Sequence, residues 1–145
     1  MDKTAFDLRQ SKQLTQANLA AVDGNNGYDH NWAVKGANND VLVHMATVTS
    51  SLTGRQMRVD STNPGIQFYT GNFLRVKMTS GSFVFLFDFV QGQTGKEGVK
   101  YTRQTAYCLE TQNFPDSPNN DNFPTATLKA GDVYQHRTVF TLSTV

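Results

Sequence analysis

Three polar side chains stand in surroundings that suit chemistry on a hydroxylated substrate: Asp29, Gln67 and Glu110. Asp29 lies between Tyr28 and Trp32, where aromatic faces can stack on the C–H groups of a sugar while a carboxylate binds its hydroxyls. Glu110 follows an apolar pair of residues, and a carboxylate that is buried there would hold a proton tightly enough to act as a general base. The amide of Gln67 is suited to binding a hydroxyl or a ring oxygen.

Each of these residues also has an ordinary structural interpretation. Asp29 would cap a turn beside core aromatic residues, and Glu110 would face outward from a strand. Gln67 would be a polar residue at the edge of a strand ladder. The residues alone leave both interpretations open.

The remaining reactive side chains indicate no further chemistry. The spacing of His30, His44 and His136 fits no metal-binding motif, and we interpret all three as structural, with His44 on a strand face and His136 at the start of a strand. Cys108 is expected to be a small core residue of an apolar strand. The sequence has no Gly-rich phosphate-binding loop and no serine or cysteine nucleophile motif.

The elements that must position these residues are strands. Helix signals are confined to one short candidate within residues 6–21, and Asn63-Pro64-Gly65 is a strong turn signal, with glycine suited to the positive φ of a type II turn. A long surface loop is expected over residues 113–124, followed by a hairpin turn at 129–132. Short strands separated by Gly/Pro turns predict an all-β, antiparallel β-sandwich. The expected strands are 41–48, 55–62, 66–70, 105–111 and 134–142.

Composition excludes several classes of function. The chain has 145 residues and a net charge of +1, so we expect a single domain without nucleic-acid binding. No apolar run reaches the roughly 20 residues of a membrane span, so no membrane partner is expected. The single cysteine and the polar start favour a cytoplasmic location. Residues 81–90 are far more apolar than their surroundings and would be an aggregation hazard if exposed.

Several motifs occur in an order that identifies a family. Residues 4–9, 28–31, 64–74 and 108–116 carry the resemblance, and residues 119–124, Gly131 and 134–138 continue it. Together they resemble the C-terminal part of the aldose 1-epimerase (galactose mutarotase) family. The resemblance implies a large antiparallel β-sandwich, of which residues 1–145 would represent the C-terminal half.

The resemblance also implies an activity and a set of site residues. The family interconverts the α and β anomers of free aldohexoses such as glucose and galactose without a cofactor. One group takes the proton of the anomeric hydroxyl, while another protonates the ring oxygen so that the ring opens. By motif, Glu110 matches the catalytic base, Asp29 matches the aspartate that binds sugar hydroxyls, and Gln67 matches a substrate-contacting glutamine.

Three departures from the family pattern modify this expectation. The active-site histidines of the family, one of them the general acid, and its substrate-binding Asn-Arg pair have no counterpart here, so we expect a chain that keeps the base and is inactive alone. Residues 75–91 interrupt the match, either as a lineage-specific loop or as retained intron sequence. Residues 103–107 replace the usual family sequence before Glu110.

Two other consequences of the pattern stay open. A half-sandwich leaves strand edges uncovered, so self-association through those edges is expected. The first alternative function is a non-catalytic carbohydrate-binding or interaction module. A glycosidase that uses Asp29 and Glu110 as a carboxylate pair is less favoured, because the family motifs point to mutarotation.

Overall fold

The computed structural model divides the chain into two compact units. The first unit comprises Met1–His30 and Phe68–Cys108, and the second comprises Asn31–Gln67 and Leu109–Val145. The interruption at 75–91 and the apolar segment 81–90 lie outside the described residues. The structure describes residues 2–22, 24, 27–37, 40–74 and 94–145.

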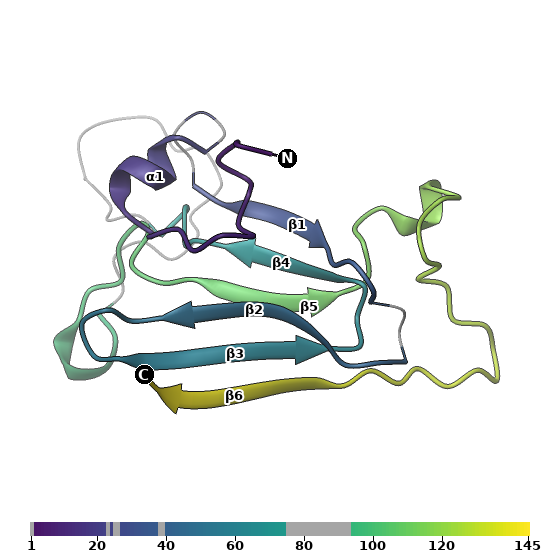
Figure 1. Cartoon of the computed structure of the whole chain (residues 1–145). Coiled ribbons are helices and arrows are strands. Elements are labelled where there is room, and N and C mark those ends of the chain that lie inside the picture. The colour runs from purple at the N-terminus through teal and green to yellow at the C-terminus, as the bar shows by residue number, and fades with distance from the viewer. Residues whose placement is uncertain (1, 23, 25–26, 38–39, 75–93) are drawn as a thin grey trace. The chain divides into compact units, whose positions relative to one another are not determined.

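The chain is nearly all-β, as the sequence predicts (Figure 1). Among the described residues the one α-helix is α1 (Gln16–Ala20); its N-cap is Thr15, whose hydroxyl accepts the Asn18 N–H at 3.1 Å. Two 3-10 turns lie at Lys96–Gly98 and Ser117–Asn119. The strands are β1 (Asp29–Ala33), β2 (Val43–Thr49), β3 (Arg55–Ser61), β4 (Gly65–Tyr69), β5 (Cys108–Gln112) and β6 (Thr138–Thr144).

The strands form two antiparallel sheets, with orders β1-β4-β5 and β2-β3-β6. This confirms the predicted fold class. Five of the six strands match predicted ones, although β6 begins at Thr138 rather than at residue 134. The sequence analysis assigned no strand to β1, because Asp, His and Asn are poor strand formers and only pairing with β4 makes them extended.

The β2-β3-β6 sheet belongs wholly to the second unit and has one apolar face. Val59 pairs with Ala46 on one side and with Phe140 on the other, and Met57 pairs with Val48 and Leu142. Because side chains alternate along a strand, these residues share a face. The apolar face consists of Val43, Ala46, Val48, Met57, Val59, Phe140 and Leu142.

The pairing of β1 with β4 follows from hydrogen bonds at its two ends. In the first unit the Thr70 N–H donates to the Tyr28 carbonyl at 3.1 Å, and in the second the Val34 N–H donates to the Pro64 carbonyl at 3.0 Å. Counting inward along antiparallel strands from Val34 and Pro64 places Asn31 opposite Gln67.

The chain bends at residues 62–64, before β4, but Gly65 does not have the positive φ that was expected of it. It begins β4 instead, and a Cβ at this position would lie 2.8 Å from Asn31 Oδ1 and 3.0 Å from Phe114 Cδ1. Glycine is therefore required here by close packing rather than by turn geometry. A turn forms at 129–132, with the Asp132 N–H donating to the Lys129 carbonyl at 3.0 Å and Gly131 at φ +93°, but it is not the predicted hairpin, because none of the described residues that directly flank it forms a strand.

Within the part of the chain that the structure describes, no helix has the length and apolar character needed to cross a membrane.

Candidate active site

A pair of amide side chains defines one polar face of the β1-β4-β5 sheet. Gln112 Nε2 on β5 donates to Asn31 Oδ1 on β1 at 3.3 Å, and the Asn31 side chain passes over Gly65 on β4. The three residues therefore point to the same side of their strands. We call this side the amide face.

Alternation along the strands places two predicted site residues on the amide face. Gln67 lies two residues after Gly65 on β4, and Glu110 lies two residues before Gln112 on β5. Gln67 is half-buried and Glu110 is exposed, which agrees with the outward-facing interpretation of Glu110. The second unit thus brings together a glutamine amide, a carboxylate and the Asn31–Gln112 amide pair.

The third predicted residue, Asp29, belongs to the first unit. It is exposed at the start of β1, on the side of that strand that also carries Asn31. Its own N–H donates to His30 Nδ1 at 3.0 Å. Asp29 is therefore described with the first unit, and Gln67 and Glu110 with the second.

The position of Asp29 is set by Tyr28, which is 0% exposed. The Tyr28 N–H donates to Thr70 Oγ1 at 2.9 Å, and its carbonyl accepts from Asn72 Nδ2 at 2.7 Å. The Tyr28 ring stacks on Phe68 with centroids 4.9 Å apart, and burial raises the pKa of its hydroxyl. Because both polar groups of the Tyr28 backbone are hydrogen-bonded, the position of the following residue, Asp29, is fixed.

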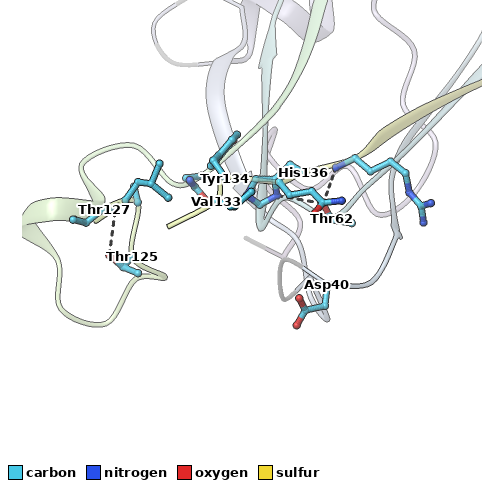
Figure 2. Close-up of a pocket in the computed structure, with 12 residues that line it drawn as sticks. Asp40, Thr62, Thr125, Thr127, Val133, Tyr134 and His136 are labelled. Atoms are coloured by element: carbon cyan, nitrogen blue, oxygen red, sulfur yellow. Dashed lines mark hydrogen bonds between the residues drawn. The ribbon is translucent and has the colours of Figure 1, made fainter. Parts of the chain in front are cut away.

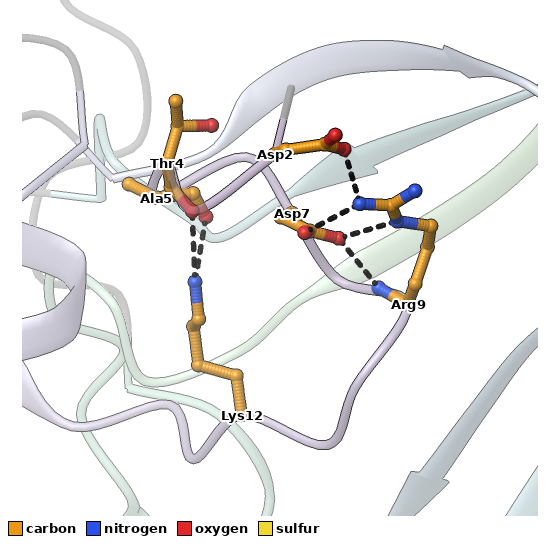
Figure 3. A network of polar contacts seen from close by, with 6 residues as sticks. All are labelled: Asp2, Thr4, Ala5, Asp7, Arg9 and Lys12. Atoms are coloured by element: carbon orange, nitrogen blue, oxygen red, sulfur yellow. Dashed lines mark hydrogen bonds and ion pairs between the residues drawn. The ribbon is translucent and has the colours of Figure 1, made fainter.

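The N-terminal segment secures the same tyrosine. The Tyr28 hydroxyl donates to the Ala5 carbonyl at 2.7 Å, and Lys12 Nζ donates to the same carbonyl at 3.2 Å. Figure 3 shows how the Arg9 guanidinium holds Asp7 at 2.8 Å and also contacts Asp2. This ion pair lowers the pKa of Asp7 through its hydrogen bond to Arg9.

A chain of hydroxyl groups supports β5 from the side opposite the amide face. The Thr111 hydroxyl lies 2.6 Å from that of Thr138, which lies 3.1 Å from that of Ser61. Asn63 Nδ2 donates to Ser61 Oγ at 3.3 Å and to Thr111 Oγ1 at 3.4 Å. Thr111 follows Glu110 directly, so these contacts of the second unit hold the backbone that presents the carboxylate.

Each histidine has a contact that suits a structural role. The His30 ring packs edge-on against Phe6 at 4.8 Å, and His44 Nε2 lies 2.8 Å from Thr47 Oγ1. His136 Nδ1 lies 3.2 Å from Thr62 Oγ1, and its ring lies 4.7 Å from that of Tyr134. Among the described residues, no three His, Cys, Asp or Glu side chains gather in a way that could hold a metal ion.

The expectation that Cys108 is a core residue is wrong. Cys108 is exposed, because the alternation that places Glu110 and Gln112 on the amide face places Cys108 there as well. The less exposed neighbouring position on β5 belongs to Leu109.

A cavity of about 620 Å³ lies elsewhere in the second unit (Figure 2). Loop residues 125–128 and 133–137 line it together with Asp40, Thr62 and Asn113. The Thr62 hydroxyl in its wall accepts the Arg137 N–H at 3.0 Å and contacts His136, so its hydrogen bonds are made within the protein. None of the three predicted site residues lines this cavity.

Asn31 and Gln112 are the members of the amide face that the sequence analysis did not select. A signal for them exists, because each lies two residues from a selected carboxylate on the same strand, Asn31 after Asp29 and Gln112 after Glu110. The alternation within one strand predicts the shared side. That β1 and β5 lie in one sheet with β4 between them is visible only in the structure.

Comparisons with known proteins agree on one family. A family profile described as aldose 1-epimerase matches residues 1–141. Galactose mutarotase from Homo sapiens is 38% identical over 144 residues, which cover 97% of this chain and 35% of that protein. Aldose 1-epimerase from Escherichia coli (strain K12) is 31% identical over 144 residues, covering 94% and 36%. The chain therefore spans 35–36% of the length of these curated relatives.

A solved structure gives the same result for the fold. The crystal structure of a GalM/aldose epimerase homologue from C. elegans superposes with a TM-score of 0.74 at 25% sequence identity. The match covers 99% of this chain and 38% of the homologue.

Proposed function

The chain belongs to the aldose 1-epimerase family, and from that premise we propose that its amide face supplies the base side of a site for free aldohexoses. In this proposal Glu110 accepts the proton of the anomeric hydroxyl, and Gln67 hydrogen-bonds the bound sugar. Asp29 binds sugar hydroxyls through its carboxylate. The substrates are hexoses such as galactose and glucose.

The chemistry balances with one proton removed and one supplied. As Glu110 takes the proton of the anomeric hydroxyl, the bond from C1 to the ring oxygen breaks, and an acid gives that oxygen a proton. The open-chain aldehyde rotates about C1 and closes on the other face. On reclosure Glu110 returns its proton to the C1 oxygen, and the C5 hydroxyl gives its proton back to the conjugate base of the acid, so both groups are regenerated.

The observation that carries the proposal is the shared direction of Gln67 and Glu110. They project from adjacent strands of one sheet beside the Asn31–Gln112 amide pair, which offers further donors and acceptors to a polyol. A hexose presents several hydroxyls on one ring, and a flat array of amides and a carboxylate suits them. This arrangement favours a sugar over an anionic or apolar ligand.

We further propose that the chain alone binds sugar but does not accelerate mutarotation. The His30 ring packs against Phe6, and His44 and His136 are engaged with Thr47 and Thr62. In this proposal none of these three side chains acts as the acid that complements Glu110. A missing general acid typically costs about 10²–10⁴-fold in rate.

The test supplies the missing acid from solution. Polarimetry on fresh α-galactose is run with the chain over a series of imidazole buffer concentrations at one pH, with a Glu110→Gln variant as the matched control. We expect no acceleration without imidazole, and a steeper dependence on imidazolium for the wild type than for the variant. Equal slopes for the two proteins, with sugar binding intact, would contradict the assignment of Glu110 as the base.

A non-catalytic carbohydrate-binding module is the alternative, and the Asn31–Gln112 amide pair favours it because amides bind sugars without catalysing their reactions. Galactose titration followed by NMR separates the two ideas. Both predict that Gln67→Ala weakens binding while Gln56→Ala, a change on the other sheet, does not. Only the base assignment predicts that Glu110→Gln changes the imidazole dependence.

A further inference from the structure

The two outer strands of the β2-β3-β6 sheet differ in how open their edges are to pairing. In β2 the register with β3 shifts between His44 and Ala46, and such a bulge twists an edge away from new partners. In β6 the register with β3 runs unbroken from Thr138 to Thr144. The sequence of β6, TVFTLST, contains no charge, proline or glycine.

The apolar face of this sheet is buried at β3 but exposed at β6. Val59 on β3 is 0% exposed, whereas its partner Phe140 on β6 is 55% exposed and Leu142 is 76% exposed. No strand of the described residues pairs with the outer side of β6. A regular, uncharged edge strand with exposed apolar side chains is the usual template for adding another strand.

The sequence of β6 is complementary to itself. If two copies pair antiparallel about a two-fold axis at Thr141, then Phe140 of each copy lies directly opposite Leu142 of the other. Val139 then faces a serine, and no charge meets a like charge, because the strand has none. Cross-strand pairs of an aromatic and an aliphatic residue stabilise antiparallel sheets.

We propose that two copies of this chain associate through their β6 edges, in antiparallel register centred on Thr141. The two sheets become one continuous sheet, and Phe140 and Leu142 are covered by their counterparts. The occupant of the edge is a second copy rather than a charged or proline-rich peptide, since the uncharged strand fits its own sequence in this register. This association is independent of the proposed sugar site.

Thr141 offers a clean test because its side chain lies on the face opposite Phe140 and is exposed. Thr141→Lys places two like charges at the two-fold axis without entering the apolar face. Thr141→Glu does the same with the opposite sign. Thr47 on β2 is also exposed and pairs with Arg58, as Thr141 does, so Thr47→Lys is the matched control at the edge that the proposal leaves unpaired.

Sedimentation analysis of the full chain over a concentration series gives the readout. We expect the mass to rise from 16.1 kDa toward twice that value, and we expect each Thr141 variant alone to raise the dissociation constant at least about ten-fold. An equimolar mixture of the Lys and Glu variants should associate again, because opposite charges then meet at the axis. Thr47→Lys should behave as the wild type.

Circular dichroism of each variant checks that the strands still form, so that loss of association is not loss of fold. A chain that stays at the mass of one copy up to its solubility limit would overturn the proposal. So would a dimer that both Thr141 variants leave unchanged. A third contrary result would be exclusive capture of the β6 edge by an added polypeptide comprising the rest of the C. elegans homologue, with no association of copies.

Discussion

The surroundings of Tyr28 in the first unit and the β3–β6 pair in the second unit are built on opposite principles. Around Tyr28, backbone and side-chain polar groups are buried and hydrogen-bonded, and the described part of that unit has no buried side-chain nitrogen or oxygen without a partner. On the paired strands β3 and β6, the apolar side chain at the centre of β3 is fully buried, whereas the apolar side chains of β6 beside it are exposed. The first region is closed and fixes a residue in place, whereas the second is open and is suited to association.

The largest loss of stability is expected from a substitution in the closed region around Tyr28. Gly27→Ala meets a positive φ of +74° and places a methyl group 2.5–2.7 Å from the side chains of Asn72, Thr70 and Gln104. Left-handed strain and overpacking together predict a loss of about 2–5 kcal/mol in the free energy of unfolding, measured by urea titration. Amide exchange at Thr70, whose N–H donates to the Tyr28 carbonyl, should accelerate in parallel.

Gly24→Ala is the matched control for this change. Gly24 also has a positive φ, +69°, but no atom of the described residues lies within 4 Å of an added Cβ. It should lose only the conformational contribution, about 1–2 kcal/mol. Equal losses for the two variants would show that the hydrogen-bonded cluster around Tyr28 accommodates an added methyl group, and would contradict the close packing inferred for it.

The next largest effects compare a buried and an exposed side chain of the open β3–β6 pair. Val59→Ala should lower the free energy of unfolding by about 2–3 kcal/mol, because it removes two fully buried methyl groups and leaves a cavity. Phe140→Ala removes a larger side chain but should cost less, about 1 kcal/mol, because more than half of that side chain is in water. Both are measured by urea unfolding at low protein concentration, and a larger loss for Phe140→Ala would mean that β6 is covered in solution.

The smallest effect concerns the charged face of the same sheet. The hydrogen-bonded ion pair with Arg58, at 2.6 and 2.8 Å, lowers the pKa of Asp60 below its ordinary value. A depressed folded-state pKa stabilises the fold at pH values above the unfolded pKa, near 3.9, and this contribution disappears as the pH falls through the folded value. Asp60→Asn should therefore be slightly less stable than the wild type at neutral pH, with a difference in urea midpoint that closes in acid. A difference that is constant with pH would exclude the ion pair as its source.

The fold class could be predicted from the sequence because its signals are local. Runs of β-branched residues and Gly/Pro turns mark β2, β3 and β6, and the structure confirms them. The strand β1 could not be predicted in this way, since its residues become extended only by pairing with β4. Gly65 was selected for turn geometry and is required for packing against Asn31, a contact between strands distant in the sequence.

The sequence could predict which residues belong to the candidate site, but not which of them share one face of the sheet. The family resemblance selects Asp29, Gln67 and Glu110, and their catalytic and binding roles stay predictions. That Gln67 and Glu110 share a face depends on strand order and register, which no local pattern contains. The same missing information explains the error at Cys108, whose apolar neighbour Leu109 suggested a buried position.

The pairing of β3 with β6 also constrains how the chain folds during its synthesis. Ser61 and Thr138, which pair across these strands, are 77 residues apart in the sequence. At typical ribosomal rates roughly 4–15 s separate the two residues. Throughout that interval the side of β3 that will pair with β6 has no partner strand, while β2, which precedes it, can already be in place. Nascent chains of this protein therefore expose a half-built sheet before β6 emerges, and this is the stage at which a ribosome-associated chaperone would find it.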